Sequence, residues 1–396
     1  MAKYSYNEKK KSFLITIIAI IIILACLVSV LISYKVNKND LFESQDFARA
    51  LASALGKKTN ELDETSLERI EVLYLSKDSQ TGLPIVSLGY DTLYYYLSID
   101  PDSDEYNEDE VTNGVNNNTY SAYLSYSFDS VNDLKLFKGL KFLYVQGFTS
   151  IKSLDFITSM PKIEMLSIGS TSIEDISLLK DFASIKTLDI SNLKLNDVSA
   201  LENLINLDGL SIDKNPINDF SFVEKLTKLK TFSFSECGVK DINFVKELTN
   251  LTSINFSTNE ISDITPLKDL TNLKSIYGAD NKIVDISPIK DLKKVDTLML
   301  NDNEIVDISA LSTLINLEYL TLSNNKIQDV TPISEITKMK YLYLDNNEIT
   351  DISSLKHFNK NSFAMINLTG NKIPDDGWSV LDKYTSTYIY GKPTNK

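Results

Sequence analysis

Residues 259–276 read NEISDITPLKDLTNLKSI, and twenty-two positions later residues 281–298 read NKIVDISPIKDLKKVDTL. A repeat of fixed length indicates a solenoid, in which each turn of the chain packs against its two neighbours. Irregular copies begin at Leu124, Leu143 and Ile366, so residues 124–376 are predicted to form twelve turns. The regular turns have their strands at Leu166, Leu188, Leu210, Phe232, Ile254, Ile276, Leu298, Leu320 and Leu342.

Each regular turn begins with alternating apolar and polar residues, which is typical of a strand with one buried face. An asparagine follows where the chain leaves the strand, and its amide can donate to one turn while it accepts from another. Thr171 and Cys237 share this column and can each donate one hydrogen, whereas Leu193 cannot, so a weak or rearranged turn is expected at Leu193. The predicted structural ladder consists of Asn215, Asn259, Asn281, Asn303, Asn325, Asn347 and Asn371.

An aspartate recurs four positions after the asparagine column. Nine carboxylates at one spacing could suggest metal binding, but each precedes Ile-Ser, Ile-Thr or a similar pair, and an aspartate there can cap a short helical segment. Proline at positions 266, 288 and 332 fits the first turn of such segments. We therefore predict a capping role for Asp175, Asp197, Asp219, Asp241, Asp263, Asp285, Asp307, Asp329 and Asp351.

These copies, with their asparagine column and repeated Asp-Ile-Ser/Thr, resemble the 22-residue class of leucine-rich repeat found in bacterial internalins. The resemblance implies an α/β leucine-rich repeat solenoid, with parallel strands on the concave face and short helical turns on the convex face. Residues 40–123 resemble the helical cap of internalins, joined to a tyrosine-rich, acidic, irregular region. Helices are expected at residues 46–56 and 65–73, and residues 377–396 are expected to form a C-terminal cap and tail.

Residues 13–33 are predicted to form a transmembrane helix, preceded by a cytoplasmic tail at residues 1–12. Residues 13–32 carry no charge, and a helix of that length spans about 30 Å of hydrocarbon. Lysines are more numerous before the segment than just after it, so the repeats are expected outside a bacterial plasma membrane, in a single-pass arrangement. Three alternatives stay open: a cleaved signal peptide, a lipoprotein acylated at Cys26, and a tethered adaptor facing the cytoplasm.

Composition argues against several functions. The formal net charge of −14 disfavours nucleic acid as a partner. The two cysteines provide no disulfide framework, and no zinc or nucleophile signature accompanies the single histidine, His357. We therefore expect no enzyme activity, no cofactor and no metal site.

The polar strand positions change character along the repeats, from small groups in the early turns to aromatic ones in the later turns. Aromatic residues and methionine on a rigid surface are typical anchors for a partner. We predict that a protein or a cell-surface polymer binds the concave face here. The predicted binding residues are Tyr277, Met299, Tyr319, Tyr341 and Tyr343, bordered by Asp280, Asp302 and Asp345. Gly278 interrupts an apolar column beneath this patch, and the sequence gives no reason for it.

Overall fold

The computed structural model describes residues 41–77, 84–88, 120–123, 131–359 and 361–393. The chain divides into two compact units, Met1–Leu140 and Lys141–Lys396. The predicted turn at Leu124, most of the tyrosine-rich region 76–123 and the predicted segments 1–12 and 13–33 lie outside the described residues.

The first unit combines helices with a small antiparallel sheet. Ser44 caps the first helix by accepting a hydrogen bond from the Phe47 N–H. The helix ends at Ala54, and Gly56 follows in a left-handed backbone conformation at φ +62°. Phe47 and Leu51 are fully buried, as the predicted helical face requires. The elements are α2 (Gln45–Ala54), η1 (Thr59–Glu61), α3 (Glu64–Glu68), β1 (Val72–Lys77), β2 (Pro84–Leu88), β3 (Tyr120–Tyr123) and η2 (Val131–Leu136).

The helix predicted at residues 65–73 is shorter than expected. Asp63 rather than Thr65 caps α3, because its carboxylate accepts from the Ser66 N–H at 2.7 Å while the Ser66 hydroxyl accepts from the Asp63 N–H. The helix ends at Glu68, and Val72 begins strand β1 instead of a third helical turn. β1 pairs with β2 and β2 with β3, both antiparallel. The described part of residues 76–123 therefore belongs to a small antiparallel sheet.

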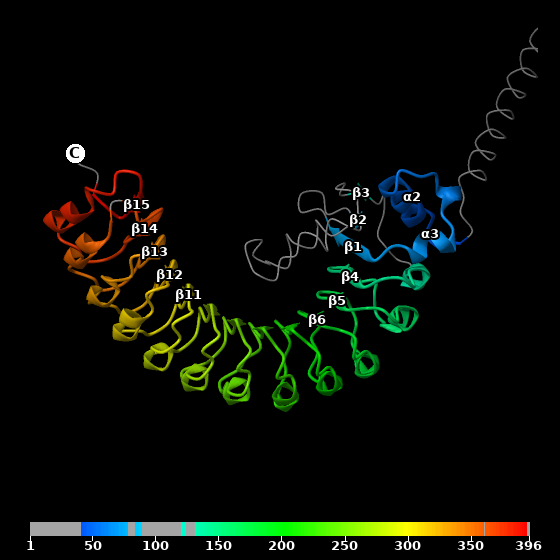
Figure 1. The fold of residues 1–396 in the computed structure, drawn as a ribbon, viewed down its shortest axis with the longest axis horizontal. Helices are drawn as coiled ribbons and strands as arrows, with labels where there is room; N and C mark the ends of the chain where they lie inside the picture. Colours follow the sequence, from blue (N-terminus) through cyan, green and yellow to red (C-terminus); the bar gives the residue numbers. More distant parts are fainter. Residues whose placement is uncertain (1–40, 78–83, 89–119, 124–130, 360, 394–396) are drawn as a thin grey trace, which may run out of the picture. The chain divides into compact units, whose positions relative to one another are not determined.

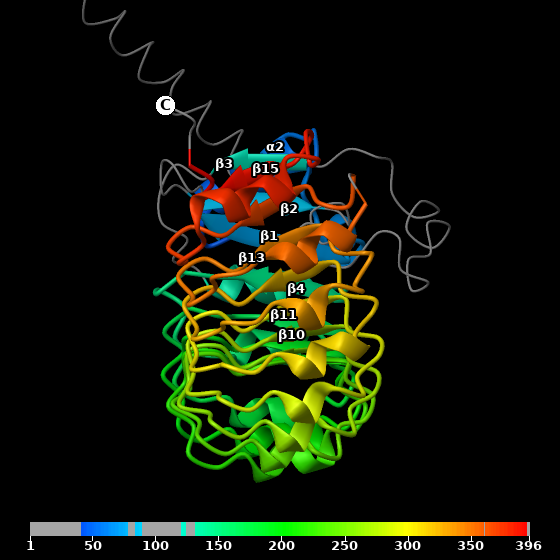
Figure 2. The ribbon, with the colours of Figure 1, turned by 90° about the vertical axis from the view of Figure 1, so that its left-hand side faces the viewer.

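The second unit is an arc of stacked turns whose strands lie along its inner, concave side (Figure 1). Figure 2 looks onto the C-terminal side of the arc, where β10, β11 and β13 lie one above another. Every neighbouring pair from β4 to β15 is parallel. The strands are β4 (Phe142–Val145), β5 (Met165–Ser167), β6 (Thr187–Asp189), β7 (Gly209–Ser211), β8 (Thr231–Ser233), β9 (Ser253–Asn255), β10 (Ser275–Tyr277), β11 (Thr297–Met299), β12 (Tyr319–Thr321), β13 (Tyr341–Tyr343), β14 (Met365–Asn367) and β15 (Tyr388–Tyr390).

Short 3₁₀ helices follow the outer side of the arc, one between each pair of strands (Figure 1). Pro266, Pro288 and Pro332 occupy the first turn of their helices, as predicted. The helices are η3 (Asp155–Ser159), η4 (Ser177–Asp181), η5 (Ser199–Asn203), η6 (Ser221–Lys225), η7 (Asn243–Val245), η8 (Thr265–Leu267), η9 (Ser287–Ile289), η10 (Ser309–Thr313), η11 (Thr331–Ile333), η12 (Ser353–His357) and η13 (Asp375–Leu381).

The core between strands and helices consists of columns of aliphatic side chains in register. Leu188 pairs with Leu210, and Ile276 with Leu298, and none of these side chains is more than 3% exposed. Burying one such side chain stabilises the fold by roughly 1.5–3 kcal/mol. Because each turn contributes several of them, stacking of neighbours supplies the stability that a single turn lacks.

The predicted asparagine ladder is confirmed. In the Asn303 turn, the amide donates to the Gly278 carbonyl at 3.0 Å and the Leu300 carbonyl at 3.2 Å, while its oxygen accepts from the Ile283 N–H at 2.9 Å. The amide therefore satisfies backbone groups in two turns at once. The same pattern of bonds holds for Asn215, Asn259, Asn281, Asn325, Asn347 and Asn371.

The rearranged turn expected at Leu193 is also present. In most turns one residue, placed just before the ladder position, adopts a left-handed backbone conformation, such as Asp302 at φ +58°. The Leu193 turn has two such residues, Asn192 at φ +57° and Lys194 at φ +61°. The Cys237 turn has the same pair, Glu236 at φ +55° and Gly238 at φ +73°. Neither leucine nor cysteine has an oxygen to accept the backbone N–H groups of the preceding turn, so the main chain follows another path in both turns.

The aspartate column caps the 3₁₀ helices, as predicted. The carboxylate of Asp175 accepts from the N–H of Ser177, the first residue of η4, at 2.7 Å, and the same bond recurs in all nine turns at 2.7–2.9 Å. These hydrogen bonds lower the pKa values of Asp175, Asp197, Asp219, Asp263 and Asp351 below the ordinary aspartate value.

Acid is therefore expected to destabilise the repeats. A carboxylate whose pKa is lower in the folded state stabilises the fold above its unfolded pKa of about 3.9, and this contribution is lost as the pH falls through the folded pKa. The midpoint temperature of thermal unfolding should fall between pH 5 and pH 2. In an Asp197→Asn/Asp219→Asn variant the decrease should be shallower, since the amide does not titrate, so the variant and the parent chain should converge at low pH. A constant difference between them at every pH would contradict the capping account.

The predicted single-pass membrane localisation needs correction. The longest α-helix in the described ranges is α2, whose 10 residues extend only about 15 Å, half of a bilayer's hydrocarbon thickness. Across the described part of the chain, no helix has both the length and the apolar character to cross a membrane. The predicted segment 13–33, with Cys26, lies outside that part. The structure thus does not support a plasma-membrane protein with extracellular repeats, and we withdraw that prediction.

Candidate functional site

Strands β4–β15 line the concave face of the second unit (Figure 1). Because side chains alternate along a strand, the residues before and after each buried central residue point away from the core. The burial pattern of β10 illustrates this: Ile276 is buried, while Ser275 and Tyr277 are half-buried. The predicted binding residues Tyr277, Met299, Tyr319, Tyr341 and Tyr343 all occupy such outward positions.

Three of the predicted residues come together as a tyrosine cluster, defined here as Tyr319, Tyr341 and Tyr343. The ring centroid of Tyr319 lies 5.4 Å from that of Tyr341 and 5.7 Å from that of Tyr343, with both pairs inclined by 35°. The Tyr343 hydroxyl donates to the Met365 sulfur at 2.9 Å. Burial raises the pKa of the Tyr343 phenol above the ordinary tyrosine value. Tyr341 is 37% exposed, which leaves one ring of the cluster open to a partner.

Tyr277 and Met299 lie beside each other but apart from the tyrosine cluster. They are register partners on β10 and β11. The next residue in their column is Thr321, which is buried and separates Met299 from Tyr343. The structure therefore divides the predicted site into an aromatic cluster and a smaller neighbouring pair.

Two of the three bordering aspartates hold the fold together. The Asp345 carboxylate accepts from the Ser323 hydroxyl at 2.5 Å and from the Asn367 amide at 3.0 Å. Asp302 accepts from the Asn324 amide at 2.7 Å and adopts a left-handed backbone conformation. Asp280 occupies the equivalent left-handed position one turn earlier, at φ +53°, and is exposed.

The sequence analysis missed part of the aromatic surface. Tyr388 and Tyr390 lie on β15, in register with Met365 and Asn367, and they are 70% and 50% exposed. The sequence analysis predicted a C-terminal cap and tail at residues 377–396 and no strand at Tyr388-Ile389-Tyr390. The alternation of aromatic and aliphatic residues was the signal that could have revealed this last strand.

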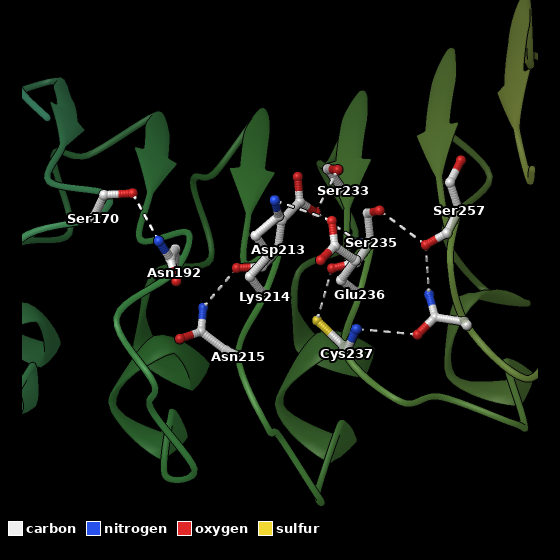
Figure 3. A network of polar contacts seen from close by, with 11 residues as sticks. Ser170, Asn192, Asp213, Lys214, Asn215, Ser233, Ser235, Glu236, Cys237 and Ser257 are labelled. Atoms are coloured by element: carbon white, nitrogen blue, oxygen red, sulfur yellow. Dashed lines mark hydrogen bonds and ion pairs between the residues drawn. The ribbon is translucent and has the colours of Figure 1, made fainter. Parts of the chain in front are cut away.

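The early turns form a contrasting polar zone of small side chains (Figure 3). Asp213 lies within it and accepts from the Ser233 hydroxyl at 2.6 Å and from the Ser235 N–H at 2.7 Å. Burial raises the pKa of Asp213 above its ordinary value. Asp189 is held similarly, by the Ser167 hydroxyl at 2.9 Å and by a backbone N–H. The hydroxyl bonds to these aspartates join neighbouring turns, so the polar groups of the zone are already satisfied within the protein.

Cys237 serves as a rung of the ladder, as predicted. Its thiol lies 3.4 Å from the carbonyls of Ile212 and Ser235, to which it can donate, and its N–H donates to the Asn259 side-chain oxygen. Figure 3 shows Cys237 beside Ser235. Burial raises the pKa of the Cys237 thiol to about 11. A cysteine with so little thiolate at neutral pH is a poor nucleophile.

Alkylation should therefore distinguish the native from the unfolded state. In a Cys26→Ser chain, which leaves Cys237 alone, iodoacetamide at pH 7.5 is expected to label the native protein at least tenfold more slowly than the same protein in urea, as followed by intact mass. The reason is that roughly one thiol in 3,000 is ionised at pH 7.5 when the pKa lies near 11. Equal rates in the two states would show an accessible, ionised cysteine.

No set of three or more metal-ligating side chains gathers anywhere in the described ranges. His357 is exposed at the end of η12. The described concave face thus offers hydrogen-bonding groups and rings for binding.

Comparisons with known proteins agree with this architecture. Residues 227–269 and 315–357 match the family model described as Leucine Rich repeats (2 copies), whereas no curated protein matches significantly. The structure is similar to that of internalin InlF from Listeria monocytogenes, with a TM-score of 0.66 and 23% identity over 89% of each chain. Internalin C2 from Listeria monocytogenes gives a TM-score of 0.46 and 28% identity over 49% of this chain and 83% of its own.

A complex of TLR13 with ssRNA13 gives a TM-score of 0.52 and 15% identity over 67% of this chain and 46% of that one. The predicted leucine-rich repeats and their likeness in fold to internalins are confirmed, whereas the membrane anchor is not supported.

Proposed function

We propose that this protein is a non-catalytic binding scaffold whose partner is another protein, docked on the concave face around the tyrosine cluster. The observation that carries the proposal is the packing of three tyrosine rings on adjacent strands, with Tyr341 open to solvent. Tyrosine provides a large contact area and a polar tip while losing little side-chain entropy on binding. Such rings are frequent at the centres of protein interfaces.

Rigidity of the frame supports the same conclusion. The cluster lies on strands fixed by parallel pairing on both sides, and beneath it the buried residues Leu320 and Leu342 are in direct register. A pre-organised surface binds without a large loss of conformational entropy. The likeness in fold to internalin InlF is consistent with a scaffold, although at 23% identity it supports the fold alone.

Site-specific photo-crosslinking tests this proposal. Benzoylphenylalanine in place of Tyr341 or Tyr388 should crosslink one and the same protein in the cells that make the chain. The same label in place of Ile205 or Ile315, both more than half exposed, serves as the control and should not capture it. Serine at Tyr319 and Tyr343 should lower the yield from position 388 at least tenfold while the thermal midpoint stays unchanged. Equal capture from all four positions would refute a concave site, and capture of a polysaccharide alone would replace the protein partner by a polymer.

A further inference from the structure

We propose that the tyrosine cluster receives a cationic side chain, arginine or lysine, from the partner protein. This inference rests on the proposed function and adds the chemistry of the contact. It starts from the way in which charges are distributed over the second unit.

Negative charges beside the strand face are neutralised by lysines of adjacent turns. Glu260 pairs with Lys282 at 2.7 Å, and Glu304 pairs with Lys326 at 2.8 Å. Glu318, next to the tyrosine cluster in sequence, pairs with Lys340 at 2.6 Å. The repeat spacing thus places an acid in one turn opposite a base in the next.

Carboxylates on the strand face itself have a different environment. The donors to Asp345 and Asp302 are neutral hydroxyl and amide groups, which orient a carboxylate without cancelling its charge. Within the described ranges, no ion pair joins Asp280, Asp302 or Asp345 to a lysine or arginine. This part of the face therefore carries net negative charge.

Basic residues border this surface but do not occupy its outward strand positions. Lys340, which directly precedes Tyr341, pairs with Glu318 at 2.6 Å. From β9 to β14, neither the outward strand positions nor the next outward position after each strand holds a lysine or arginine, although the chain contains 40 of them. Asp345 is two residues after Tyr343 along β13, and side chains at this spacing point to the same side of a strand. A ring cluster next to an unneutralised carboxylate attracts a cation both through the ring quadrupole and through the carboxylate charge.

The geometry of the rings suits such a contact. The 35° inclination and the centroid distances of 5.4 and 5.7 Å are those of tilted, overlapping rings rather than edge-to-face rings, so ring faces point in similar directions. A guanidinium or ammonium group over the face of a tyrosine, within about 6 Å of its centroid, is attracted by the ring quadrupole. Tyr341 is the exposed ring, and its ring neighbour is Tyr319. Tyr319 also contacts Tyr343, whose hydroxyl bond to Met365 holds that ring in place.

A short peptide probe tests the inference independently of the natural partner. Acetyl-tetra-arginine amide, titrated into the full chain and followed by calorimetry at low ionic strength, is expected to bind, whereas the tetra-citrulline peptide, a neutral isostere, should not. Leucine at Tyr319, Tyr341 and Tyr343 should weaken binding about tenfold, while phenylalanine at the same positions should change it less than about threefold, because phenylalanine retains the ring face.

Charge controls separate a specific contact from general attraction by an acidic protein. Asn at Asp280, Asp302 and Asp345 removes three charges and should weaken binding about tenfold. Gln at Glu174, Glu224 and Glu247 removes the same number from exposed positions off the strand face and should change binding less than about twofold. Unchanged binding in the leucine variant, equal losses in the two charge variants, or no binding by the parent chain would each overturn the inference. If crosslinking at Tyr341 still captures a protein in those cases, the proposed function stands and only the cationic contact fails.

Discussion

Replacing Asn215 with leucine is expected to lower the free energy of unfolding by about 3–5 kcal/mol, the largest loss of any ladder position. Asn215 is fully buried. Its oxygen accepts from the N–H groups of Leu193 and Leu195 at 3.2 and 3.0 Å, and its amide donates to the Ile190 and Ile212 carbonyls at 2.9 and 2.8 Å. Each buried backbone group left without a partner costs about 1–3 kcal/mol.

The position is unusually sensitive because neither neighbouring rung can compensate. Leu193 precedes Asn215 in the column and Cys237 follows it, and neither carries an amide. Removing Asn215 would therefore leave four consecutive turns, at Thr171, Leu193, residue 215 and Cys237, without an asparagine rung. Urea unfolding, together with amide hydrogen exchange of residues 190–217, measures both the loss and its location.

Asn206→Leu is the matched control for this prediction. Asn206 is near the surface, donates to the Ala183 carbonyl at 3.1 Å and accepts from the Lys228 ammonium at 2.7 Å. Because water can replace both partners at the surface, the same change of side chain should cost less than about 1 kcal/mol. A loss at position 215 no greater than at position 206 would show that the ladder bonds add little to stability.

Gly278→Leu is expected to destabilise the repeats by about 2–3 kcal/mol, although it restores the aliphatic residue found in this column in other turns. A Cβ at residue 278 would lie 2.3 Å from Cε2 and 2.5 Å from Cζ of Phe256, and 3.0 Å from Leu300 Cδ2. The fully buried Phe256 ring thus fills its own position and also the space that a side chain at residue 278 would need. Equilibrium urea unfolding of the single variant measures the effect of overfilling.

A double-mutant cycle checks the cause. Phe256→Leu alone leaves a cavity and should also destabilise, whereas Phe256→Leu combined with Gly278→Leu should regain at least about 2 kcal/mol of the summed losses. Two effects that simply add would show that Gly278 is required for a reason other than the Phe256 ring.

Most of the repeat architecture could be predicted because single columns of the sequence specify single bonds. The asparagine and aspartate columns each predicted a hydrogen bond. The aspartate bond occurs in all nine regular turns, and the asparagine bonds occur in each turn that has an asparagine at this position. Even the exception was informative, since an apolar Leu193 among amides predicted a changed turn. The region before the repeats was harder, because residues 70–73 carry apolar residues that fit a helix as well as a strand, and β1 pairing decides between them.

The candidate site was only partly predictable. The place of a residue in the repeat shows that it lies on the strand face but not which residues it contacts. The sequence therefore did not distinguish Asp345 from the exposed Tyr341, although the Asp345 carboxylate accepts hydrogen bonds from Ser323 and Asn367. The reason for Gly278 lies one turn away, in the size of Phe256, and an analysis of each column position by residue type alone does not include it. Ring distances and exposed fractions depend on such neighbours and require coordinates.

Strand β15 ends the row of parallel strands, and among the described residues of its unit no further strand follows it. An open sheet edge can recruit strands from other molecules and so nucleate aggregation. Here the edge strand is only three residues long. Gly391, at φ +92°, follows the strand and is itself followed by Lys392 and Pro393. A charge and a residue without an N–H oppose continued strand pairing. The molecule can thus expose Tyr388 and Tyr390 at its tip while resisting growth into fibrils.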